Sequence, residues 1–206
     1  MIAHSIGTAL ESGLFDRVIV STDSDEIAEV ARAWGAEVPF LRPAELANDI
    51  TGTDAVLLHG IHASEKLYGP VGLACCIYAT VPLLRAEYLH EGLKLLQQSG
   101  AASSFAVATF PYPIFRALRI NERDQLQLQW PEYAETRSQD LPEVFLDAGQ
   151  FYWVDAQQFK AIPCTLHNAV PVMLPRWAVQ DIDTPEDWEV AENLFHALEL
   201  RQWHPT

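Results

Sequence analysis

Two aspartates near the end of the sequence have the residue type and spacing of a metal site. Asp181 and Asp183 are separated by one isoleucine and follow an apolar run. If residues 177–183 form a strand, alternate side chains share a face, so both carboxylates point to the same side. Two like charges repel unless a cation lies between them, and hard oxygen ligands of this kind suit Mg²⁺. The alternative interpretation is a solvated acidic turn.

The acidic residues that follow have a structural use. Thr184 is a favourable helix N-cap, and Pro185 suits the first helical position. Glu186 and Asp187 place negative charge in the first turn, where free N–H groups and the helix dipole favour it. These four residues therefore predict a helix start and require no chemistry.

Size and charge restrict the class of protein. The chain has 206 residues and a net charge of −15, which favours one main domain and disfavours nucleic acid or an anionic membrane as a partner. With only 13 basic residues, an anionic substrate would have to be held by a few Arg or Lys side chains or by a metal.

Membrane-spanning runs, a signal peptide and cysteine motifs would each bear on the compartment of the protein. No apolar run reaches the length of about 18 residues that a spanning helix needs, and the first residues lack the basic and apolar regions of a signal peptide. The three cysteines have no disulfide or metal spacing. We therefore expect a cytoplasmic protein.

Hydrophobic periodicity predicts alternating helices and strands, and hence an α/β fold with a mostly parallel sheet. A polar, hairpin-like excursion interrupts the pattern after residue 116. The predicted helices cover residues 6–13, 24–35, 53–69 and 86–100. Gly13 is expected to end the first of them, and Ser24 is expected to cap the second. The predicted strands cover residues 17–23, 37–43, 71–84, 102–110, 149–159 and 177–183.

Polar side chains follow several of these strands. In parallel sheets, ligands gather at the carboxyl ends of the strands. We therefore expect a single rim formed by residues 21–23 after the first predicted strand, Thr80 after the apolar strand, and Asp181 and Asp183 after the last.

Several stretches in order along the chain carry a family resemblance. They are "VIVSTDSDEIAEVARAWGAEVPFLRPAELANDITGTDAV", "YATVPLL", "DAGQFYWVD" and "VQDIDTPEDWEVAE". The sequence resembles the cytidylyltransferases that activate nine-carbon keto sugar acids as CMP-sugars, across almost its whole length. The resemblance implies a Rossmann-like nucleotidyltransferase fold in a single domain over residues 1–206. The motifs "TGTDAV", "FPYPIFRAL" and "AGQFYW" are more similar to the pseudaminic acid enzymes than to those for N-acetylneuraminic acid, with N-acetylneuraminate or legionaminate as the alternative substrates.

The resemblance implies a reaction and a nucleotide site. The anomeric hydroxyl of the sugar acid attacks the α-phosphate of CTP, and pyrophosphate leaves. Mg²⁺ is required, with Asp181 and Asp183 as its ligands and catalytic residues. The residues expected to bind CTP are Thr22, Asp23, Arg42, Thr53 and Thr80.

The resemblance also implies a sugar-acid site and a homodimer. Arg137 would meet the carboxylate, a role that its planar guanidinium suits. Gln150, Phe151 and Tyr152 would line the pocket, with core packing as the alternative role for the aromatic residues. Arg116 is a further candidate whose competing role is a contact with the partner subunit. The excursion at about residues 117–142 resembles the small lobe through which subunits of this family dimerise.

One departure from the family pattern concerns the start of the chain. The family's first strand and its basic, glycine-rich loop, which wraps the triphosphate, have no counterpart, and "MIAHSIGTAL" resembles the helix that follows that loop. Two expectations follow. Either the chain is a shortened CMP-sugar synthetase with impaired CTP binding, or it is a non-catalytic homologue that keeps a sugar-acid pocket. The general base is not identified by either.

Overall fold

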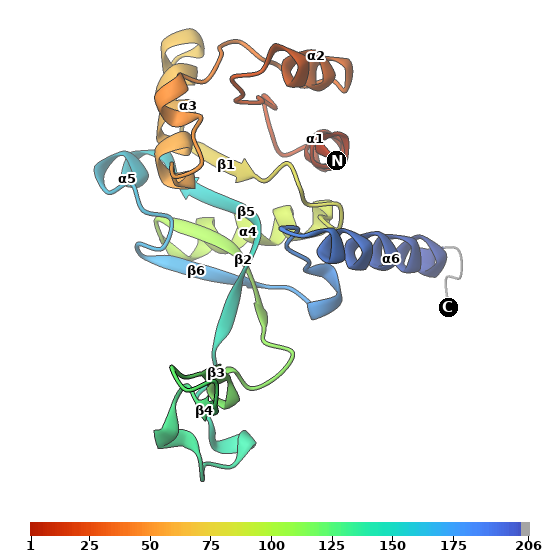
Figure 1. Ribbon diagram of the computed structural model, residues 1–206. Coiled ribbons are helices and arrows are strands. Elements are labelled where there is room, and N and C mark those ends of the chain that lie inside the picture. The colour runs from red at the N-terminus through yellow and green to blue at the C-terminus, as the bar shows by residue number, and fades with distance from the viewer. Residues whose placement is uncertain (203–206) are drawn as a thin grey trace.

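The computed structural model describes residues 1–202 and contains an α/β body from which a small lobe projects (Figure 1). The helices are α1 (Ile2–Ser12), α2 (Asp25–Ala33), α3 (Thr53–Tyr68), α4 (Ala86–Ser99), α5 (Ala156–Ala161) and α6 (Pro185–Gln202). The strands are β1 (Leu73–Ile77), β2 (Ser103–Thr109), β3 (Leu118–Ile120), β4 (Leu126–Leu128), β5 (Phe145–Asp155) and β6 (Ala169–Met173).

The body contains a four-stranded sheet with the order β1-β5-β2-β6. The long strand β5 is antiparallel to both of its neighbours, whereas β2 and β6 pair in parallel. All strands of this sheet except β5 therefore run in the same direction. The predicted α/β fold with a mostly parallel sheet is confirmed in this sense.

Both faces of β5 are buried. On one face, Phe151 and Trp153 are at most 2% exposed and pack with Leu89 of α4. On the other, Val154 packs with Ile61 of α3. The central strand therefore holds the α3 and α4 layers together, which explains its continuous apolar and aromatic sequence.

Local capping signals predicted three helix ends correctly. Ser24 caps α2, because its Oγ accepts from the N–H of Ile27 at 3.4 Å. Gly13 ends α1 with φ +65°, a left-handed conformation that favours glycine. At α6, the Thr184 hydroxyl donates to Asp187 Oδ2 at 2.7 Å and accepts from the Asp187 N–H at 3.3 Å. The hydrogen bonds that the Thr184 hydroxyl and N–H donate to the carboxylate lower the pKa of Asp187.

Two predicted strands near the N-terminus form only one bridge. Within residues 17–23 and 37–43, the Val20 N–H donates to Glu37 O at 2.9 Å, and the Glu37 N–H donates to Val18 O at 2.8 Å. No longer ladder forms there, although residues 17–20 have the β-branched sequence of a strand. These segments thus depart from the prediction because a ladder needs a partner edge as well as strand-forming residues.

The apolar strand predicted over residues 71–84 is shorter and differently paired. It forms β1, whose partner β5 is antiparallel rather than parallel. The ladder is bounded by Gly72 O, which accepts from Ala156 N–H, and by Tyr78 N–H, which donates to Gln150 O. Because pairing alternates along an antiparallel ladder, the backbone groups of Cys75 and Ile77 point away from β5. The pairing of β1 is thus an exception to the mostly parallel sheet that the sequence predicts.

The strand predicted over residues 177–183 is absent from the structure. A 3₁₀ turn at Arg176–Ala178 is followed by a loop that contains Asp181 and Asp183. The strand on this side of the sheet is β6, which lies before Pro175 and pairs in parallel with β2. Since β6 takes the place beside β2, Asp181 and Asp183 lie in a loop. The alternation of side chains along a strand therefore does not determine where their carboxylates point.

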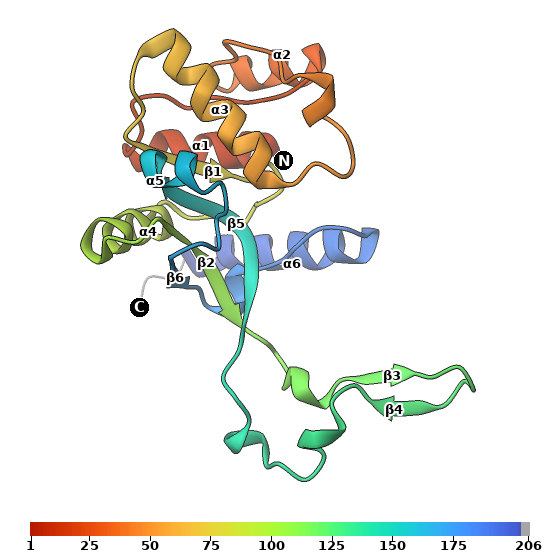
Figure 2. The same cartoon turned by 90° about the vertical axis from the view of Figure 1, so that its left-hand side faces the viewer.

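The lobe lies between β2 and β5, where the chain leaves the sheet and returns (Figure 2). It contains the β3–β4 hairpin, whose turn is held by Asn121 Oδ1 accepting from the N–H groups of Arg123 and Gln125. The excursion predicted at about residues 117–142 falls within this lobe.

In residues 1–202, no helix has the length and apolar character needed to cross a membrane.

Candidate functional site

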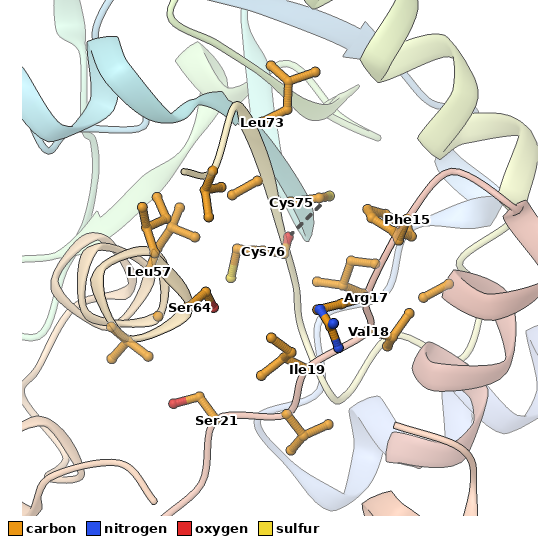
Figure 3. Close-up of a pocket in the computed structure, with 18 of the residues that line it drawn as sticks. Phe15, Arg17, Val18, Ile19, Ser21, Leu57, Ser64, Leu73, Cys75 and Cys76 are labelled. Atoms are coloured by element: carbon orange, nitrogen blue, oxygen red, sulfur yellow. Dashed lines mark hydrogen bonds between the residues drawn. The ribbon is translucent and has the colours of Figure 1, made fainter. Parts of the chain in front are cut away.

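A cleft of about 1060 Å³ separates the free edge of β1 from residues 17–22 (Figure 3). Ile19 and Cys75 both lie along it, one on each side. Since Val18 and Val20 bond to Glu37, the backbone groups of Ile19 point the other way, toward the cleft. Among the described residues, no backbone hydrogen bond joins the two sides. The cleft therefore has main-chain donors and acceptors on two facing edges.

Three of the predicted CTP-binding residues meet at one end of this cleft. The backbone N–H of Arg42 donates to Thr22 O at 2.7 Å, and Arg42 Nη2 lies 3.8 Å from Asp23 Oδ1. The Arg42 Nε is buried and has no hydrogen-bond partner within the part of the chain that is described. Arg42 therefore keeps a donor that an anionic group could use.

Thr53 also lines the cleft, whereas Thr80 does not. Thr53 is the first residue of α3, and its hydroxyl hydrogen-bonds to that of Tyr78. Ser5 of α1 donates to Tyr78 O at 2.8 Å. Thr80 is exposed in the loop beyond. Tyr78 was missed from the sequence, although its position at the carboxyl end of β1 was a signal for it.

The two aspartates lie in a loop against the beginning of β5. Gly149 has φ +59°, and a Cβ placed on it would be 4.0 Å from Asp181 Oδ1, so the β5 backbone closely approaches that carboxylate. Asp181 Oδ1 accepts only from the adjacent Ile182 N–H, and the Asp183 carboxylate has no partner in the described chain. Both side chains are exposed. The loop thus offers free carboxylate oxygens.

This donor set fits a weakly chelated Mg²⁺ ion. Residues 1–202 contain no group of three or more His, Cys, Asp and Glu side chains that could hold a metal. Mg²⁺ is commonly bound by one or two carboxylates plus waters and substrate phosphates. Two free carboxylates in one loop are therefore compatible with such an ion, but not with an all-protein cage.

The residues of β5 that were expected to line a sugar pocket are divided between two faces. Phe151 is fully buried in the core, so core packing, the alternative role, is the one seen. Gln150 is buried on the opposite face, where its Nε2 donates to Ala178 O while Oε1 has no partner among described residues. Tyr152 is also largely buried, and its hydroxyl donates to Asp147 at 2.9 Å.

The two predicted arginines lie in the lobe and have different environments. Arg116 donates to Ala134 O at 2.7 Å and also to Thr136 O, so it ties the lobe's turns together. Arg137 pairs with Asp140 at 2.6 Å, yet 72% of its side chain is exposed. Only Arg137 is therefore readily available to a ligand.

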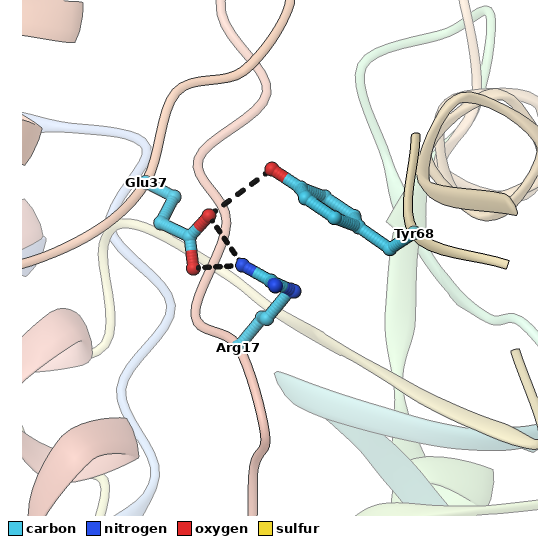
Figure 4. Close-up of polar contacts among 3 residues, drawn as sticks. All are labelled: Arg17, Glu37 and Tyr68. Carbon is cyan, nitrogen blue, oxygen red and sulfur yellow. Dashed lines mark hydrogen bonds and ion pairs between the residues drawn. The ribbon is translucent and has the colours of Figure 1, made fainter. Parts of the chain in front are cut away.

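An ionic cluster that the sequence did not suggest lies at the cleft wall (Figure 4). Arg17 Nη1 lies 2.8 Å from both Glu37 carboxylate oxygens, and its Cζ lies 3.7 Å from the centre of the Tyr68 ring. The Tyr68 hydroxyl donates to Glu37 at 3.1 Å. Desolvation and then Glu37 raise the pKa of Tyr68. The cluster joins the end of α3 to residues 17–37.

Comparisons with known proteins agree with this architecture. The structure is similar to that of a CMP:2-keto-3-deoxy-manno-octonic acid synthetase complexed with CTP, with a TM-score of 0.65 over 96% of this chain and 88% of that chain. Sequence identity is only 16%, so this likeness concerns the fold.

Sequence comparison gives the family. The chain is 38% identical to a pseudaminic acid cytidylyltransferase of Campylobacter jejuni over 201 residues, which is 95% of this chain and 84% of that relative. It is 31% identical to an N-acylneuraminate cytidylyltransferase of Oncorhynchus mykiss, over 93% of this chain and 43% of that protein. A family model described as cytidylyltransferase matches residues 1–132. The chain therefore belongs to the cytidylyltransferase family.

Proposed function

We propose that this protein transfers CMP from CTP to the anomeric hydroxyl of a nine-carbon keto sugar acid and releases pyrophosphate. We further propose pseudaminic acid as the sugar. The observation that carries the proposal is the 38% identity with the Campylobacter jejuni relative across 95% of the chain. The residues described above at the end of the cleft and in the loop of Asp181 and Asp183 have the chemistry that such a transfer requires.

Arg42 is the proposed triphosphate ligand. In a chain of net charge −15, a polyanion needs a specific cationic group. The Arg42 guanidinium has an unused Nε and a loose, 3.8 Å ion pair with Asp23. The guanidinium can therefore rotate toward a phosphate at a small cost in free energy. Thr22, whose carbonyl holds the Arg42 backbone, positions it.

Asp181 and Asp183 are the proposed Mg²⁺ ligands. Their exposed carboxylates keep oxygens free for a cation. Mg²⁺, when bound, would neutralise charge on the phosphate oxygens and orient them for in-line displacement. Because Gly149 brings β5 close to Asp181, the sugar acid held beside β5 would lie next to the reacting phosphate.

Arg137 is the proposed ligand of the sugar carboxylate, and it would act in a homodimer. It directly precedes the 3₁₀ turn at Ser138–Asp140. That turn belongs to the segment between β4 and β5, which forms part of the projecting lobe (Figure 1). The lobe also exposes apolar side chains, with Ile120 and Leu126 each 69% exposed. Exposed apolar surface of this kind marks protein contacts. Pairing of two lobes would cover that surface and bring Arg137 to the partner's rim, where a substrate carboxylate could replace Asp140.

The direct test measures pyrophosphate release from CTP in the presence of Mg²⁺ and each sugar acid. We expect kcat/KM for pseudaminic acid to exceed that for N-acetylneuraminic acid at least about tenfold, which requires about 1.4 kcal/mol of differential transition-state binding. A preference for N-acetylneuraminic or legionaminic acid would overturn the sugar assignment. Binding of a sugar acid without turnover of any would instead support the non-catalytic alternative.

The metal assignment is tested by Asp181→Ala and Asp183→Ala. Each should lower Mg²⁺-dependent turnover at least about a hundredfold, while circular dichroism stays unchanged because both side chains are exposed. Glu186→Ala, which removes an exposed carboxylate from the adjoining helix, is the matched control and should keep near-normal turnover. Full activity in both aspartate variants would remove the metal site from the proposal.

A further inference from the structure

One glutamine joins the loop of Asp181 and Asp183 to the start of α6. The Gln180 Nε2 donates to Asp181 O at 2.8 Å and to Asp187 Oδ1 at 3.2 Å. Both of these partners can only accept, so the amino group of the amide is the end that must face them. Gln180 therefore links the backbone of one proposed metal ligand to a carboxylate of the helix.

The carboxylate of Asp187 does more than cap α6. Its Oδ2 accepts from the N–H and the hydroxyl of Thr184, at 2.9 and 2.7 Å, as in a capping box. The same oxygen also accepts from the Asp183 N–H at 3.3 Å, while Oδ1 accepts from Gln180. A helix cap requires neither of these last two contacts. Both of them reach back from the helix to the loop.

These contacts hold the backbone of the two aspartates and leave their carboxylates free. The Asp181 carbonyl accepts from Gln180, and the Asp183 N–H donates to Asp187. The backbone is thus held on both sides of Ile182. Within residues 1–202, the hydrogen bond recorded for these two carboxylates is the one that Asp181 Oδ1 accepts from the Ile182 N–H, at 3.1 Å. The loop is therefore fixed while most of its carboxylate oxygens stay open to a cation.

The beginning of the loop is anchored independently of Gln180. Ala178 is fully buried, and its carbonyl accepts from the Nε2 of Gln150 in β5. A change at Gln180 should therefore loosen residues 181–183 without releasing the chain from the sheet.

We propose that Gln180 is a positioning residue, which joins the Asp181 carbonyl to the Asp187 carboxylate and so holds Asp181 and Asp183 in the arrangement that binds Mg²⁺. The identity of the cation rests on the proposed function. Mg²⁺ requires ligands close to octahedral geometry, so the relative placement of the two carboxylates matters. A loop that is already ordered also loses less conformational entropy when the ion binds.

The first experiment measures binding without turnover. Mn²⁺ takes the same oxygen ligands as Mg²⁺ and is paramagnetic, so titration with Mn²⁺ alone should broaden the Ile182 amide signal in NMR spectra. Gln180→Met keeps the length of the side chain but removes its donors. Losing these hydrogen bonds should raise the Kd for Mn²⁺ about three- to tenfold. Gln98→Met, which makes the same change at an exposed position of α4, is the matched control and should leave the Kd unchanged.

Two failures of this experiment are distinguishable. If Mn²⁺ does not broaden Ile182 in the wild-type protein, the metal assignment of the proposed function is overturned. If Mn²⁺ binds the wild-type protein and Gln180→Met with the same Kd, the metal assignment stands and the positioning role of Gln180 is overturned.

The second experiment separates positioning from general damage. Because Gln180→Met leaves the Thr184 contacts of the capping box in place, the urea midpoint should stay near that of the wild-type protein. The Mg²⁺ concentration for half-maximal turnover should rise about three- to tenfold, while KM for the sugar acid changes less than about twofold. A lowered urea midpoint with an unchanged Mg²⁺ requirement would show a purely structural role and overturn the proposal.

A double-mutant cycle tests whether Gln180 acts through Asp187. In an Asp187→Ala background the amide has already lost its anchor on the helix, so Gln180→Met should raise the Kd for Mn²⁺ by less than about 1.5-fold more. Equal effects of Gln180→Met in the two backgrounds would contradict the proposal.

Discussion

The sheet around β5 and the region before β1 are built from similar sequences but reach different structures. Around β5, three ladders join four strands, and helices cover both faces. Before β1, the β-branched residues 17–20 form a single bridge with Glu37 and face an open cleft. Strand-forming residues are present in both regions, so side-chain propensity does not account for the difference.

The difference lies in the backbone partners. In the first region, β5 has a paired edge on each side. In the second, Ile19 and Cys75 line the cleft from opposite sides without a ladder between them. A strand is completed by its neighbours, since each backbone group needs a partner or water. The cleft region is therefore held by side-chain contacts, such as those of Arg17 with Glu37 and Tyr68, instead of by a sheet.

Hydrogen exchange should give the largest contrast between the two regions. Amides of β5 should exchange only through global unfolding, whereas those of Ile19, Cys75 and Ile77 face the cleft and should exchange through small fluctuations. We expect protection factors to differ by about 10⁴ when measured by NMR. Val20, bonded to Glu37, is the control on the same segment and should be better protected than Ile19. Equal protection of Ile19 and the β5 amides would show that the cleft edges are paired.

The alkylation rate of Cys76, on the same edge of β1, should differ from that of an ordinary thiol by a factor of about 10³. Burial raises the pKa of Cys75, and burial followed by the charge of Asp54 raises the pKa of Cys76 to about 12. Compared with an ordinary thiol of pKa about 8.5, alkylation of Cys76 at pH 8 should be about 10³ slower. The rate should rise about tenfold per pH unit until the pKa is approached. Mass spectrometry of iodoacetamide-labelled peptides measures it, and rapid labelling at pH 8 would show that water in the cleft reaches the thiol and offsets its desolvation.

The same thiols predict a sign for the pH dependence of stability. A thiol whose folded-state pKa is raised remains neutral in the fold but ionises in the unfolded chain above about pH 8.5. The stability associated with Cys76 is therefore complete at lower pH and declines between about pH 8.5 and 12. Urea unfolding at pH 8 and pH 10 should show this decline, and Cys76→Ala should make it shallower.

Elements decided by neighbouring residues could be predicted from the sequence. The caps at Ser24, Gly13 and Thr184 were predicted because each depends on contacts within about three residues. The mostly parallel α/β arrangement also followed from alternation along the chain. Asp181 and Asp183 were identified as unusual because residue type and spacing are visible in a sequence.

Features decided by distant contacts could not be predicted. Residues 177–183 were expected to form a strand, but β6 takes that place beside β2. Arg116 looked available to a ligand, yet it donates to carbonyl groups 18 and 20 residues away. Tyr78 is an ordinary strand residue in sequence, and only the fold shows its contact with Thr53. Period and composition carry no information about such pairings.

Alanine substitutions at two helical glycines should change the free energy of unfolding by smaller amounts and in opposite directions. In α4, a Cβ on Gly92 would lie 2.8 Å from Phe151 Cε2 and 2.9 Å from Trp153 Cδ1. Gly92→Ala should therefore lower the free energy of unfolding by about 1–3 kcal/mol through overpacking. In α3, Gly60 lines the cleft and has no atom within 4 Å of its Cβ position. Gly60→Ala should raise the free energy by up to about 1 kcal/mol, because alanine favours helix.

Urea denaturation of both variants checks this pair. Opposite changes in midpoint at an unchanged m-value are the expected result. Destabilisation by Gly60→Ala comparable to that of Gly92→Ala would mean that the cleft is closed around α3 in solution, and would remove the packing difference between the two regions.

The smallest expected effect concerns the cluster that holds the cleft wall in place of a ladder. The pKa of Tyr68 is raised by desolvation, then by its hydrogen bond to Glu37 and the charge of Glu37, while Arg17 lowers it. Glu37→Gln removes the negative charge and should bring the Tyr68 pKa down toward its ordinary value. Arg17→Met removes the opposing positive charge and should raise it further. NMR titration of ¹³Cζ-labelled tyrosine follows Tyr68 separately from the other tyrosines, with Tyr68→Phe assigning its signal. Since the two changes act on one wall by opposite charges, shifts in the same direction would show that the variants open the cleft, and that the side-chain cluster is needed to keep residues 17–37 against α3.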